Sequence, residues 1–432
     1  MLVNTRKLVS ILIIFIGWNT VQAQEVWTRS TAPNAQQTLT LEDCYRLVEQ
    51  HYPLSKQNQL LAQKSSYEME GIHTAKLPQI NLNAQTTYQS DVVGLPIAMS
   101  SVEAMNKDQY RATLDVNQLI YNGGVIDANT KLKEAQTKTS QQQVAVQLYQ
   151  LKTRINQYYF SILLLQEKKA LLHSKNELLI SKIQEVKSGG RNGALIPASE
   201  LVLEAETIKI DQQLTEIKFE RIKMIQNLSE LTFTAINPET MLLPPNSAPT
   251  LTNGKRPELT LYDLQQQQVE FSKNLISKSR LPKVSAFGQA GYGNPGLNML
   301  DNSFQPFYIV GLKASWNVFD WGKSKKDLHA LGIAQDIVAA EKETFVLNNK
   351  IELQQMDNEI SKIEQLLESD LEMIKTREKI VQTSDAQMKN GVITTSEYLT
   401  EFVHLFEAKN TLKTHEVQLS LAKSNYEIIK GK

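Results

Sequence analysis

The stretch LPQINLNAQTTY at Leu77–Tyr88 recurs as LPKVSAFGQAGY at Leu281–Tyr292, 204 residues further along the chain. Downstream of each stretch, Tyr110–Gly124 aligns with Tyr308–Gly322 at an offset of 198. The difference between the two offsets means that the loop between the matched segments is six residues shorter in the second copy. The chain is therefore an internal duplication, in which each half repeats the same order of elements.

Four segments within the two copies alternate between apolar and polar residues, which is the period of a β-strand. We expect strands at about 78–90, 108–121, 282–293 and 307–319. Each is about ten residues long with aromatic residues at its ends, as a membrane β-barrel strand requires. A small soluble antiparallel sheet with one wet face would show the same pattern. Four strands cannot close a barrel, so the membrane interpretation requires several copies: a dimer supplies eight strands and a trimer twelve.

The two faces of these strands differ in character. One face is polar, and we expect its charged residues to line the lumen of the barrel: Arg111, Asp115 and Lys313. The opposite face is apolar, and we expect three of its residues to contact lipid: Leu114, Val310 and Leu312. A charge on the lipid side of a barrel costs about 2–4 kcal/mol near mid-bilayer, so mutation can distinguish the two faces.

The rest of the chain contains few residues that break helices. Gly and Pro are absent from 125–188, 198–237, 333–390 and 392–430. Apolar residues in the two longest regions repeat in heptads, so each long helix needs a partner helix along its length. A helix of about 60 residues is roughly 90 Å long, which favours a helical barrel or a coiled-coil stalk over a globular core. We expect helices at about 41–76, 125–188, 198–232, 258–280, 323–389 and 395–430.

The N-terminal segment has the features of a signal peptide. Two basic residues precede an apolar run over 8–17, and small residues permit cleavage before Gln24. The apolar run is too short to span a bilayer, so we expect the mature chain to be exported. The single cysteine, Cys44, cannot form an internal disulfide, and export with one cysteine favours a bacterial envelope.

These signals predict the organisation of the whole chain. Residues 1–23 form the signal peptide and 24–39 an N-terminal extension. The first repeat covers 40–235, a Pro-rich linker covers 236–257, and the second repeat covers 258–430. Lys+Arg and Asp+Glu number 46 each, so no basic excess favours nucleic acid as a partner.

Motifs that would indicate an enzyme are weak. Gly291–Gly296 has the spacing of a dinucleotide-binding loop, but the residues after it provide no helix for a pyrophosphate. Gly322–Ser324 resembles the end of a phosphate loop, but Asn317 stands where an upstream Gly is required. Glu70–His73 and Glu401–His404 have the spacing of di-iron bundles, yet they fall at different points of the repeat. We therefore expect no catalytic residue, no metal and no cofactor.

Two strand-to-helix junctions and two turns complete the pattern. The junctions are Tyr121–Gly124 and Phe319–Gly322, where we expect the chain to turn at Gly123, Gly124, Trp321 and Gly322. The turns between long helices are Asn192–Gly193 and Asn390–Gly391, each with a leucine eight residues after the Gly. This ordered set, over about 40–430, resembles the TolC-type outer-membrane efflux proteins.

The resemblance implies a mainly α fold with a membrane β-barrel part. Proteins of this family are homotrimers, in which each protomer contributes four strands to a 12-stranded outer-membrane barrel. The long helices continue as an α-helical barrel across the periplasm, and the linker at 236–257 belongs to an equatorial belt. The implied function is a passive channel for efflux or type I secretion, surrounded by outer membrane lipid. An inner-membrane pump and a periplasmic adaptor (a membrane fusion protein) are the implied partners.

The resemblance also assigns roles to the turns between the long helices. The adaptor would dock at these tip turns, which comprise Arg191, Asn192, Gly193, Asn390 and Gly391. The family narrows its periplasmic entrance with acidic residues just after the second turn, and Glu397 occupies the first such position. Thr400 stands at the next one, so we expect a less negative constriction than is usual.

A second interpretation is a periplasmic coiled-coil adaptor or scaffold protein with a small soluble sheet. It would use helical hairpins to bridge partners and would not contact the outer membrane. Cell fractionation separates the two, because an adaptor is expected in periplasmic or inner-membrane material.

Overall fold

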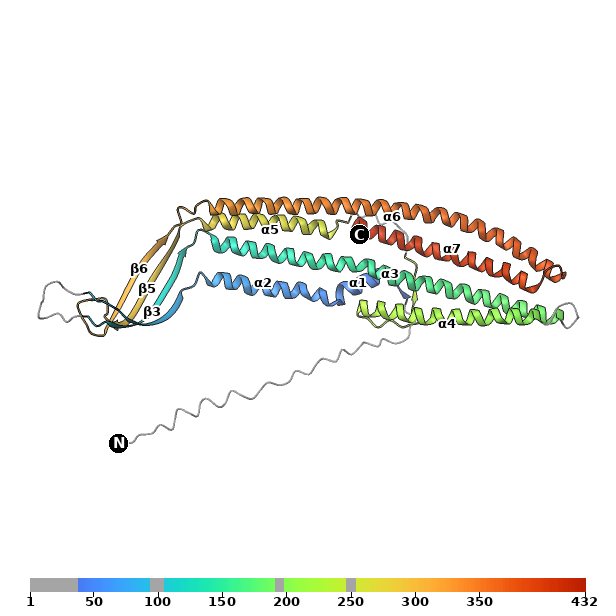
Figure 1. Cartoon of the computed structure of the whole chain (residues 1–432), viewed down its shortest axis with the longest axis horizontal. Coiled ribbons are helices and arrows are strands. Elements are labelled where there is room, and N and C mark those ends of the chain that lie inside the picture. The colour runs from blue at the N-terminus through green and yellow to red at the C-terminus, as the bar shows by residue number, and fades with distance from the viewer. Residues whose placement is uncertain (1–37, 94–104, 191–197, 246–253) are drawn as a thin grey trace, which may run out of the picture. The chain divides into compact units, whose positions relative to one another are not determined.

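The computed structural model describes residues 38–93, 105–190, 198–245 and 254–432. These residues form a four-stranded sheet, a two-stranded sheet and a set of long helices (Figure 1). None of the helices in these ranges combines the length and the apolar character needed to cross a membrane.

The larger sheet is built by both copies of the repeat. It consists of β2 (Gln79–Tyr88), β3 (Asp108–Tyr121), β5 (Lys283–Asn294) and β6 (Gln305–Ser315). All neighbouring pairs are antiparallel, and the order β2-β3-β5-β6 leaves β2 and β6 as the two edges. The two hairpins have one register, because Ile80 pairs with Val116 and their counterparts Val284 and Ala314 pair in the same way. The sequence duplication is therefore also a duplication of structure.

Strand β6 is shorter than its sequence pattern predicts. The strand expected at 307–319 ends at Ser315, whereas its counterpart β3 continues to Tyr121. The last residues of β3 pair with β5, but residues 316–319 extend beyond the start of β5 and lie on the edge of the sheet. Their alternating pattern is that of a strand, and the neighbour that would pair with them is missing from this chain.

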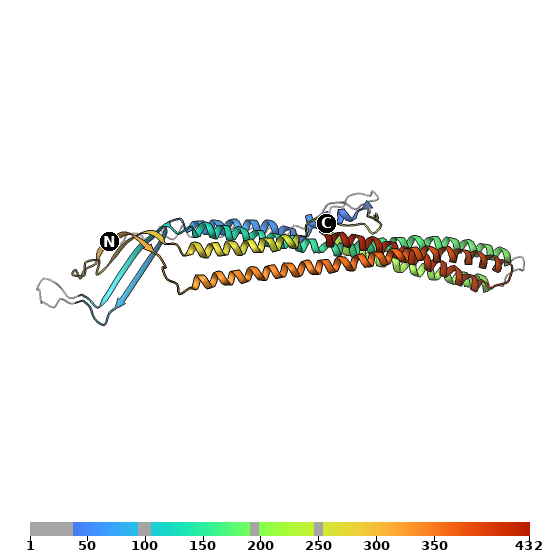
Figure 2. The same cartoon turned by 90° about the horizontal axis from the view of Figure 1, so that it is seen from above.

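Four helices are continuous with this sheet through short junctions: α2 (Lys56–Thr74), α3 (Val125–Gly190), α5 (Pro257–Ser279) and α6 (Lys323–Lys389). Helix α3 packs against both α2 and α5, and α5 packs in turn against α6 (Figures 1 and 2). Gly and Pro are absent from α3 before its last two residues, so nothing interrupts its backbone hydrogen bonds. Its 66 residues correspond to roughly 100 Å of helix.

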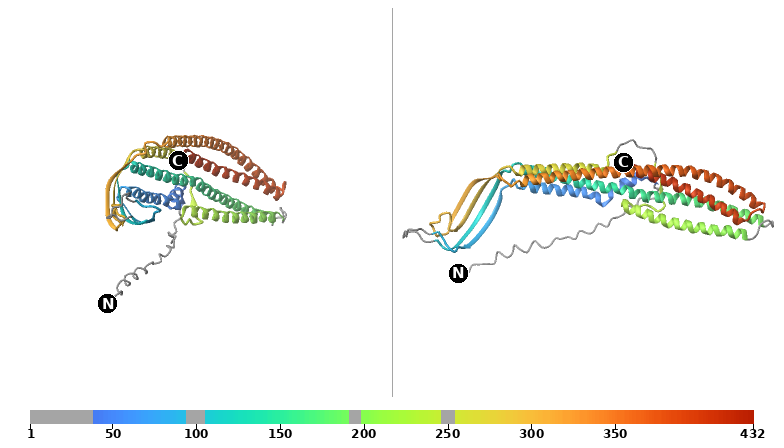
Figure 3. Two further views of the ribbon diagram at one scale, coloured as in Figure 1. Left: turned by 60° about the vertical axis from the view of Figure 1, so that its left-hand side comes forward. Right: turned by 45° about the horizontal axis from the view of Figure 1, so that its top comes forward.

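The parts of α3 and α6 that lie away from the sheet have other partners. Helix α4 (Ala198–Thr232) packs along α3, and α7 (Thr395–Lys430) packs along α6 (Figure 3). Helices α3 and α7 are also in contact. The heptad pattern in these parts of α3 and α6 is therefore packed against helices of the same chain.

The helix predicted at 41–76 is wrong in one respect, because it is divided at Pro53. Helix α1 (Leu41–His51) is followed by a 3₁₀ turn, Pro53–Ser55, and then by α2. Proline has no N–H and disfavours a helical conformation in the preceding residue, and Tyr52 is extended, with φ −62° and ψ 134°. Helix α1 begins with a capping box at Thr40 and buries Cys44, where burial raises the pKa of the thiol to about 12.

The described part of the linker is attached to the helical core. Strand β4 (Met241–Leu242) pairs in parallel with β1 (Thr38–Leu39). The hydroxyl oxygen of Tyr159, in α3, lies 2.9 Å from the carbonyl oxygen of Leu39 and 2.6 Å from that of Leu243, and its single proton is donated between these two acceptors. Tyr159 is fully buried, so these acceptors satisfy a polar group that water does not reach.

Candidate functional site

The four-stranded sheet has one apolar face, and that face is exposed. Leu82 has 78% of its surface exposed, and Val310 and Leu312 have 74% each. Leu114, on β3, is 45% exposed. Side chains of this kind are normally buried, so a continuous exposed face indicates contact with lipid or with a partner.

Aromatic residues border this apolar face at both ends of the strands. Tyr88, Tyr110 and Tyr292 lie at the end away from the helices, where the ring of Phe304 stacks on that of Tyr292 with centroids 5.6 Å apart. Trp316 follows β6 at the helical end, and its Nε1–H donates to the carbonyl oxygen of Arg280 at 3.0 Å. Rings with a polar tip at both borders are typical of a sheet that crosses a bilayer.

The opposite face is polar and internally hydrogen-bonded. The carboxylate of Asp115 accepts bonds from Asn83 Nδ2 at 2.5 Å, Gln289 Nε2 at 2.6 Å and Thr113 Oγ1 at 3.2 Å. These bonds connect three neighbouring strands. They are not evident from the sequence, because Asn83 and Gln289 lie far from Asp115 along the chain.

The other two predicted lumen residues lie on this polar face without contacting Asp115. Arg111 lies on the same strand, and its guanidinium lies over the ring of Phe307, 5.4 Å from the centroid. Lys313 is on β6, opposite Ser285 in the register. The structure therefore places all three charges on one face and separates Lys313 from the other two.

The two strand-to-helix junctions have left-handed backbone conformations, as their glycines suggest. Gly123 has φ +69° and Gly124 +80°, and at the second junction Trp321 has φ +54° and Gly322 +77°. At Gly123 a Cβ atom would lie 2.6 Å from Cβ of Leu281, so this position tolerates only glycine. Around Gly322, such a Cβ would have no described atom within 4 Å apart from those of the adjacent residues. Gly123 therefore packs closely against the end of α5, whereas Gly322 has free space beside it.

The second tip turn connects α6 to α7 and is described in full. Gly391, at φ +70°, donates its N–H to the carbonyl oxygen of Met388 at 3.0 Å, which ends α6. Asn390 donates Nδ2–H to the carbonyl of Ala386 at 2.8 Å. Arg191, Asn192 and Gly193, predicted for the first tip, lie outside the described residues.

Glu397 forms part of the helix cap that follows this turn. Its carboxylate accepts bonds from the N–H of Thr394 at 2.7 Å and from the hydroxyl of Thr394 at 2.9 Å. These bonds lower the pKa of Glu397, which is exposed. The T-x-x-E pattern at 394–397 is a sequence signal for this capping box, and the sequence reasoning missed it. Thr400, one turn further, donates to the carbonyl of Ser396 at 3.0 Å.

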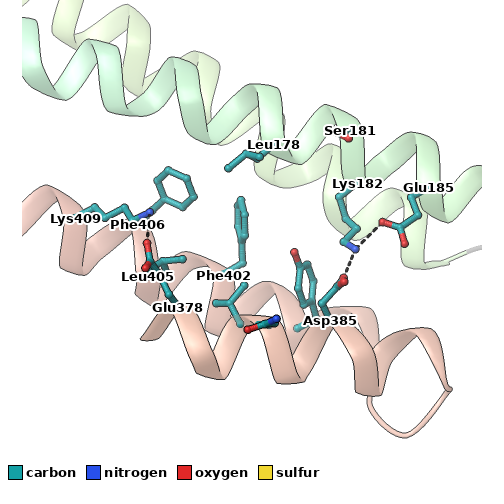
Figure 4. A pocket seen from close by; sticks show the side chains of 13 residues that line it. Leu178, Ser181, Lys182, Glu185, Glu378, Asp385, Phe402, Leu405, Phe406 and Lys409 are labelled. Atoms are coloured by element: carbon teal, nitrogen blue, oxygen red, sulfur yellow. Dashed lines mark hydrogen bonds and ion pairs between the residues drawn. The ribbon is translucent and has the colours of Figure 1, made fainter. Parts of the chain in front are cut away.

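Four charged residues connect the ends of the two long helices near the tips, and three of them, Lys182, Glu185 and Asp385, are seen in Figure 4. Lys182 Nζ, on α3, lies 2.7 Å from Glu185 and also pairs with Asp385 on α6. Lys389 Nζ lies 2.8 Å from Glu185 and 2.9 Å from Asp385. Burial raises the pKa of both carboxyls, but the two lysines outweigh it and the net shift is downward. Because the helices are about 200 residues apart in sequence, no local pattern indicated this network.

A groove of about 380 Å³ lies beside this network, between α3 and the hairpin of α6 and α7. Phe402 and Phe406 point into it from α7, and Leu178 faces them from α3 (Figure 4). Tyr398, Phe402 and Phe406 follow one face of α7, with successive ring centroids 6.0 and 5.0 Å apart. This aromatic row belongs to a buried apolar cluster that also includes Leu179 of α3 and Leu203 of α4.

The motifs with di-iron spacing have ordinary contacts. Glu401 pairs with Arg377 at 2.8 Å, and His404 lies 3.8 Å from the same carboxylate. Glu70 accepts a bond from Ser66 within its own helix. Across the described parts of the chain, no three His, Cys, Asp or Glu side chains are placed to hold a metal ion.

Comparison with known proteins adds family and fold evidence. Residues 57–177 match the family model described as outer membrane efflux protein. None of the curated proteins matches the chain significantly. The chain is 13% identical to the outer membrane protein VceC from Vibrio cholerae, with a TM-score of 0.65 over 90% of this chain and 96% of that one.

Two further solved structures show the same likeness. The channel-forming protein CusC is 12% identical, with a TM-score of 0.66 over 93% of this chain and 96% of that one. The open state of the MtrE outer membrane channel from Neisseria gonorrhoeae is 13% identical, with a TM-score of 0.61 over 90% of this chain and 89% of that one. These likenesses confirm the predicted fold, mainly helical with a four-stranded sheet, and the predicted resemblance to outer-membrane efflux proteins. The family model, VceC and MtrE are described as outer membrane proteins, and the outer membrane is the location predicted for this chain.

Proposed function

We propose that this chain, which has the fold of the outer membrane efflux proteins, is the outer-membrane subunit of a tripartite efflux or type I secretion system. Three copies would close a 12-stranded barrel and form a passive exit duct for solutes. A periplasmic adaptor would connect the duct to an inner-membrane pump, which would supply the energy.

The exposed apolar face of the sheet is the observation that carries this proposal. A soluble adaptor or scaffold, the alternative, would leave Leu82, Val310 and Leu312 in water, where apolar surface is costly at about 25 cal/mol per Å². A barrel in a bilayer places the same side chains in lipid and gives the polar face an aqueous lumen. The aromatic borders favour the bilayer for the same reason.

The two free edges of the sheet support the assembly of several copies. Edge strands β2 and β6 present unpaired backbone groups, which a bilayer interior would not satisfy. Helix α6 also exposes apolar residues, among them Ile333 and Ile337, and α2 exposes Leu60 and Tyr67. Since α3 and α5 pack together inside the chain, their counterparts α6 and α2 would pack between copies.

The polar face of the sheet would form the lumen. Asp115 is held by three donors, and Arg111 rests on Phe307, so both side chains have defined positions. Lys313 supplies a second positive charge from another strand. The lumen would thus carry both signs of charge, as suits a duct that passes varied solutes.

The helical tips would form the periplasmic entrance. Glu397 lies on the exposed side of the first turn of α7, and Thr400 follows it by one turn. We assign Glu397 to the narrow part of the entrance, where Thr400 adds no charge. The turns at Arg191–Gly193 and Asn390–Gly391 would receive the adaptor.

The substitution Val310→Arg tests the proposal directly. An arginine facing lipid near mid-bilayer costs about 2–4 kcal/mol, so the yield of assembled trimer in detergent extracts of membranes should fall. Ile309→Arg is the matched control, because Ile309 is the adjacent residue on the polar face. The lipid assignment is wrong if both variants give the trimer yield of the wild type.

A further inference from the structure

We infer that copies of this chain join along a seam between β6 of one copy and β2 of the next, with Leu312 directly opposite Thr86 of the neighbouring copy. This inference rests on the proposed function, because it specifies how the sheets of several copies close. It goes beyond that proposal by giving the register, residue by residue, of a contact that lies outside a single chain.

The internal duplication contains a complete example of the seam. Strand β3 of the first copy of the repeat pairs with β5 of the second, and Leu114 lies opposite Ala290. Strand β6 is the counterpart of β3 at an offset of 198, and β2 is the counterpart of β5 at an offset of 204. The counterpart of Leu114, 198 residues later, is Leu312, and the counterpart of Ala290, 204 residues earlier, is Thr86. The transferred register therefore pairs Leu312 with Thr86.

Two observations justify this transfer of register. The hairpins β2–β3 and β5–β6 have identical registers under the same offsets. The strand ends are also attached to the helices in the same way in both copies. Gln118 Nε2–H donates to the carbonyl of Lys76 at 2.9 Å, and its counterpart Trp316 Nε1–H donates to the carbonyl of Arg280 at 3.0 Å. Both copies of the repeat therefore connect helix to strand in the same way. We expect β6 and the neighbouring β2 to pair in the register that β3 and β5 show within the chain.

The transferred register matches apolar residues that are now exposed. Trp316, 61% exposed, would lie opposite Leu82 of the neighbouring copy, and Phe319 would lie opposite Ile80. A slip of one residue would turn these side chains toward the opposite face from their partners. A slip of two residues would preserve the faces but would misalign the helix ends, which the attachment bonds hold in place.

The same register explains why β6 ends at Ser315. Residues 316–319 correspond to the last residues of β3, which are a strand because β5 lies beside them. In the seam, β2 of the neighbouring copy would supply that partner and extend β6 to Phe319. Ile120 is passed over by the irregular register between Leu119 and Tyr121, so its counterpart Val318 would stay unpaired.

The internal pairing and the proposed seam differ at the strand-to-helix junctions. Gly123 approaches Leu281 so closely that no Cβ fits, and its counterpart is Trp321, which is 85% exposed. The counterpart of Leu281 is Leu77, which is 58% exposed on the other edge. The indole of Trp321 would therefore pack over Leu77 of the neighbouring copy. The two backbones would lie further apart there than they do at Gly123 and Leu281.

Paired cysteines test the register in the full-length protein. Residues directly opposite in an antiparallel pair lie about 4.5–5.5 Å apart at Cα, within the range of a disulfide, whereas diagonal positions are less favourable. The test variant is Leu312→Cys with Thr86→Cys, in a Cys44→Ala background. The shifted controls combine Leu312→Cys with Ala84→Cys or with Tyr88→Cys. Leu114→Cys with Ala290→Cys is the internal counterpart and should form an intrachain disulfide under the same oxidation.

Non-reducing electrophoresis of oxidised membranes gives the result. We expect covalent dimers and trimers for the 312/86 pair and little or none for either shifted pair. Stronger linking of a shifted pair, or an assembled oligomer in which the 312/86 pair does not link, would overturn the register. Light scattering of the detergent-purified wild type distinguishes failure of the proposed function, because a chain that is monomeric there has no seam at all.

Discussion

Replacing Lys182 with methionine removes the central charge of the network that connects α3 to α6 near the tips. The ammonium group contacts Glu185 and Asp385, and its side chain is only 9% exposed. It also lies 5.0 Å from the ring centroid of Tyr398. Methionine preserves most of the apolar stem, so the change isolates the charge and its hydrogen bonds.

The structure sets the size of the expected effect. Removing one partner of a fully buried ion pair costs about 3–5 kcal/mol. Here the two carboxylates are 44% and 27% exposed, and Lys389 still contacts both of them. Solvent and the remaining lysine reduce the cost, so we expect a local destabilisation of about 1–2 kcal/mol.

The pH dependence of this contribution follows from the two carboxyls. The net pKa shifts of Glu185 and Asp385 are downward, from usual values of 4.5 and 3.8. Their stabilisation is therefore fully present above those usual values and is lost as pH falls through the lower folded-state pKa values. The wild-type tip should loosen in acid below about pH 4, and Lys182→Met should weaken this dependence.

Hydrogen exchange measures the effect where it occurs. A loss of 1–2 kcal/mol corresponds to about 5- to 30-fold faster exchange through local opening, once intrinsic rates are corrected for pH. Peptides from 178–188 of α3 and 380–389 of α6 should show it, and peptides near the sheet should not. Lys389→Met is the control, because that side chain is 50% exposed and should cost less than about 1 kcal/mol. Equal exchange in the two variants would refute the reasoning.

Two further predictions concern Glu397 and the first junction. Glu397→Gln removes the charge but can preserve the capping box. Single-channel recordings at neutral pH should therefore show higher conductance or altered cation preference. Traces identical to those of the wild type would show that Glu397 does not line the entrance. Glu397→Ala should add a loss of about 0.5–2 kcal/mol from the cap, measured by denaturation. Gly123→Ala should destabilise the protein by about 1–3 kcal/mol more than Gly124→Ala, because both have positive φ but only the first Cβ meets Leu281, at 2.6 Å. Thermal unfolding checks this difference, and equal melting temperatures would contradict it.

Much of the fold follows from patterns that a single chain displays locally. Long regions without Gly or Pro indicate the long helices, and α6 begins and ends at the predicted residues, Lys323 and Lys389. Period-two alternation indicates the strands, and the repeat predicts that the two halves share one hairpin. Two expected elements differ from the structure for different reasons. Pro53 divides the first helix, which is a local effect of proline, whereas β6 ends early because residues 316–319 have no neighbouring strand in this chain.

The predicted sites depended more on family resemblance than on local pattern. The polar face with Arg111, Asp115 and Lys313 follows from alternation, but the three donors around Asp115 come from other strands. The charges around Lys182 come from two helices that are far apart in the chain. Glu397 differs from these residues, because the local sequence pattern at 394–397 does indicate its role in a helix cap.

The sequence by itself determined the duplication, the periods of strand and helix, and the positions of the turns. These are local properties, set by backbone sterics and by which side chains recur at a fixed spacing. Only the tertiary structure decided which strands are neighbours, which face remains exposed and which charges meet at the tips. Those features depend on contacts between residues distant in the chain, whose energies no local spacing records. The edges of the larger sheet are the clearest example, because only the strand order β2-β3-β5-β6 leaves β2 and β6 without a second neighbouring strand in this chain.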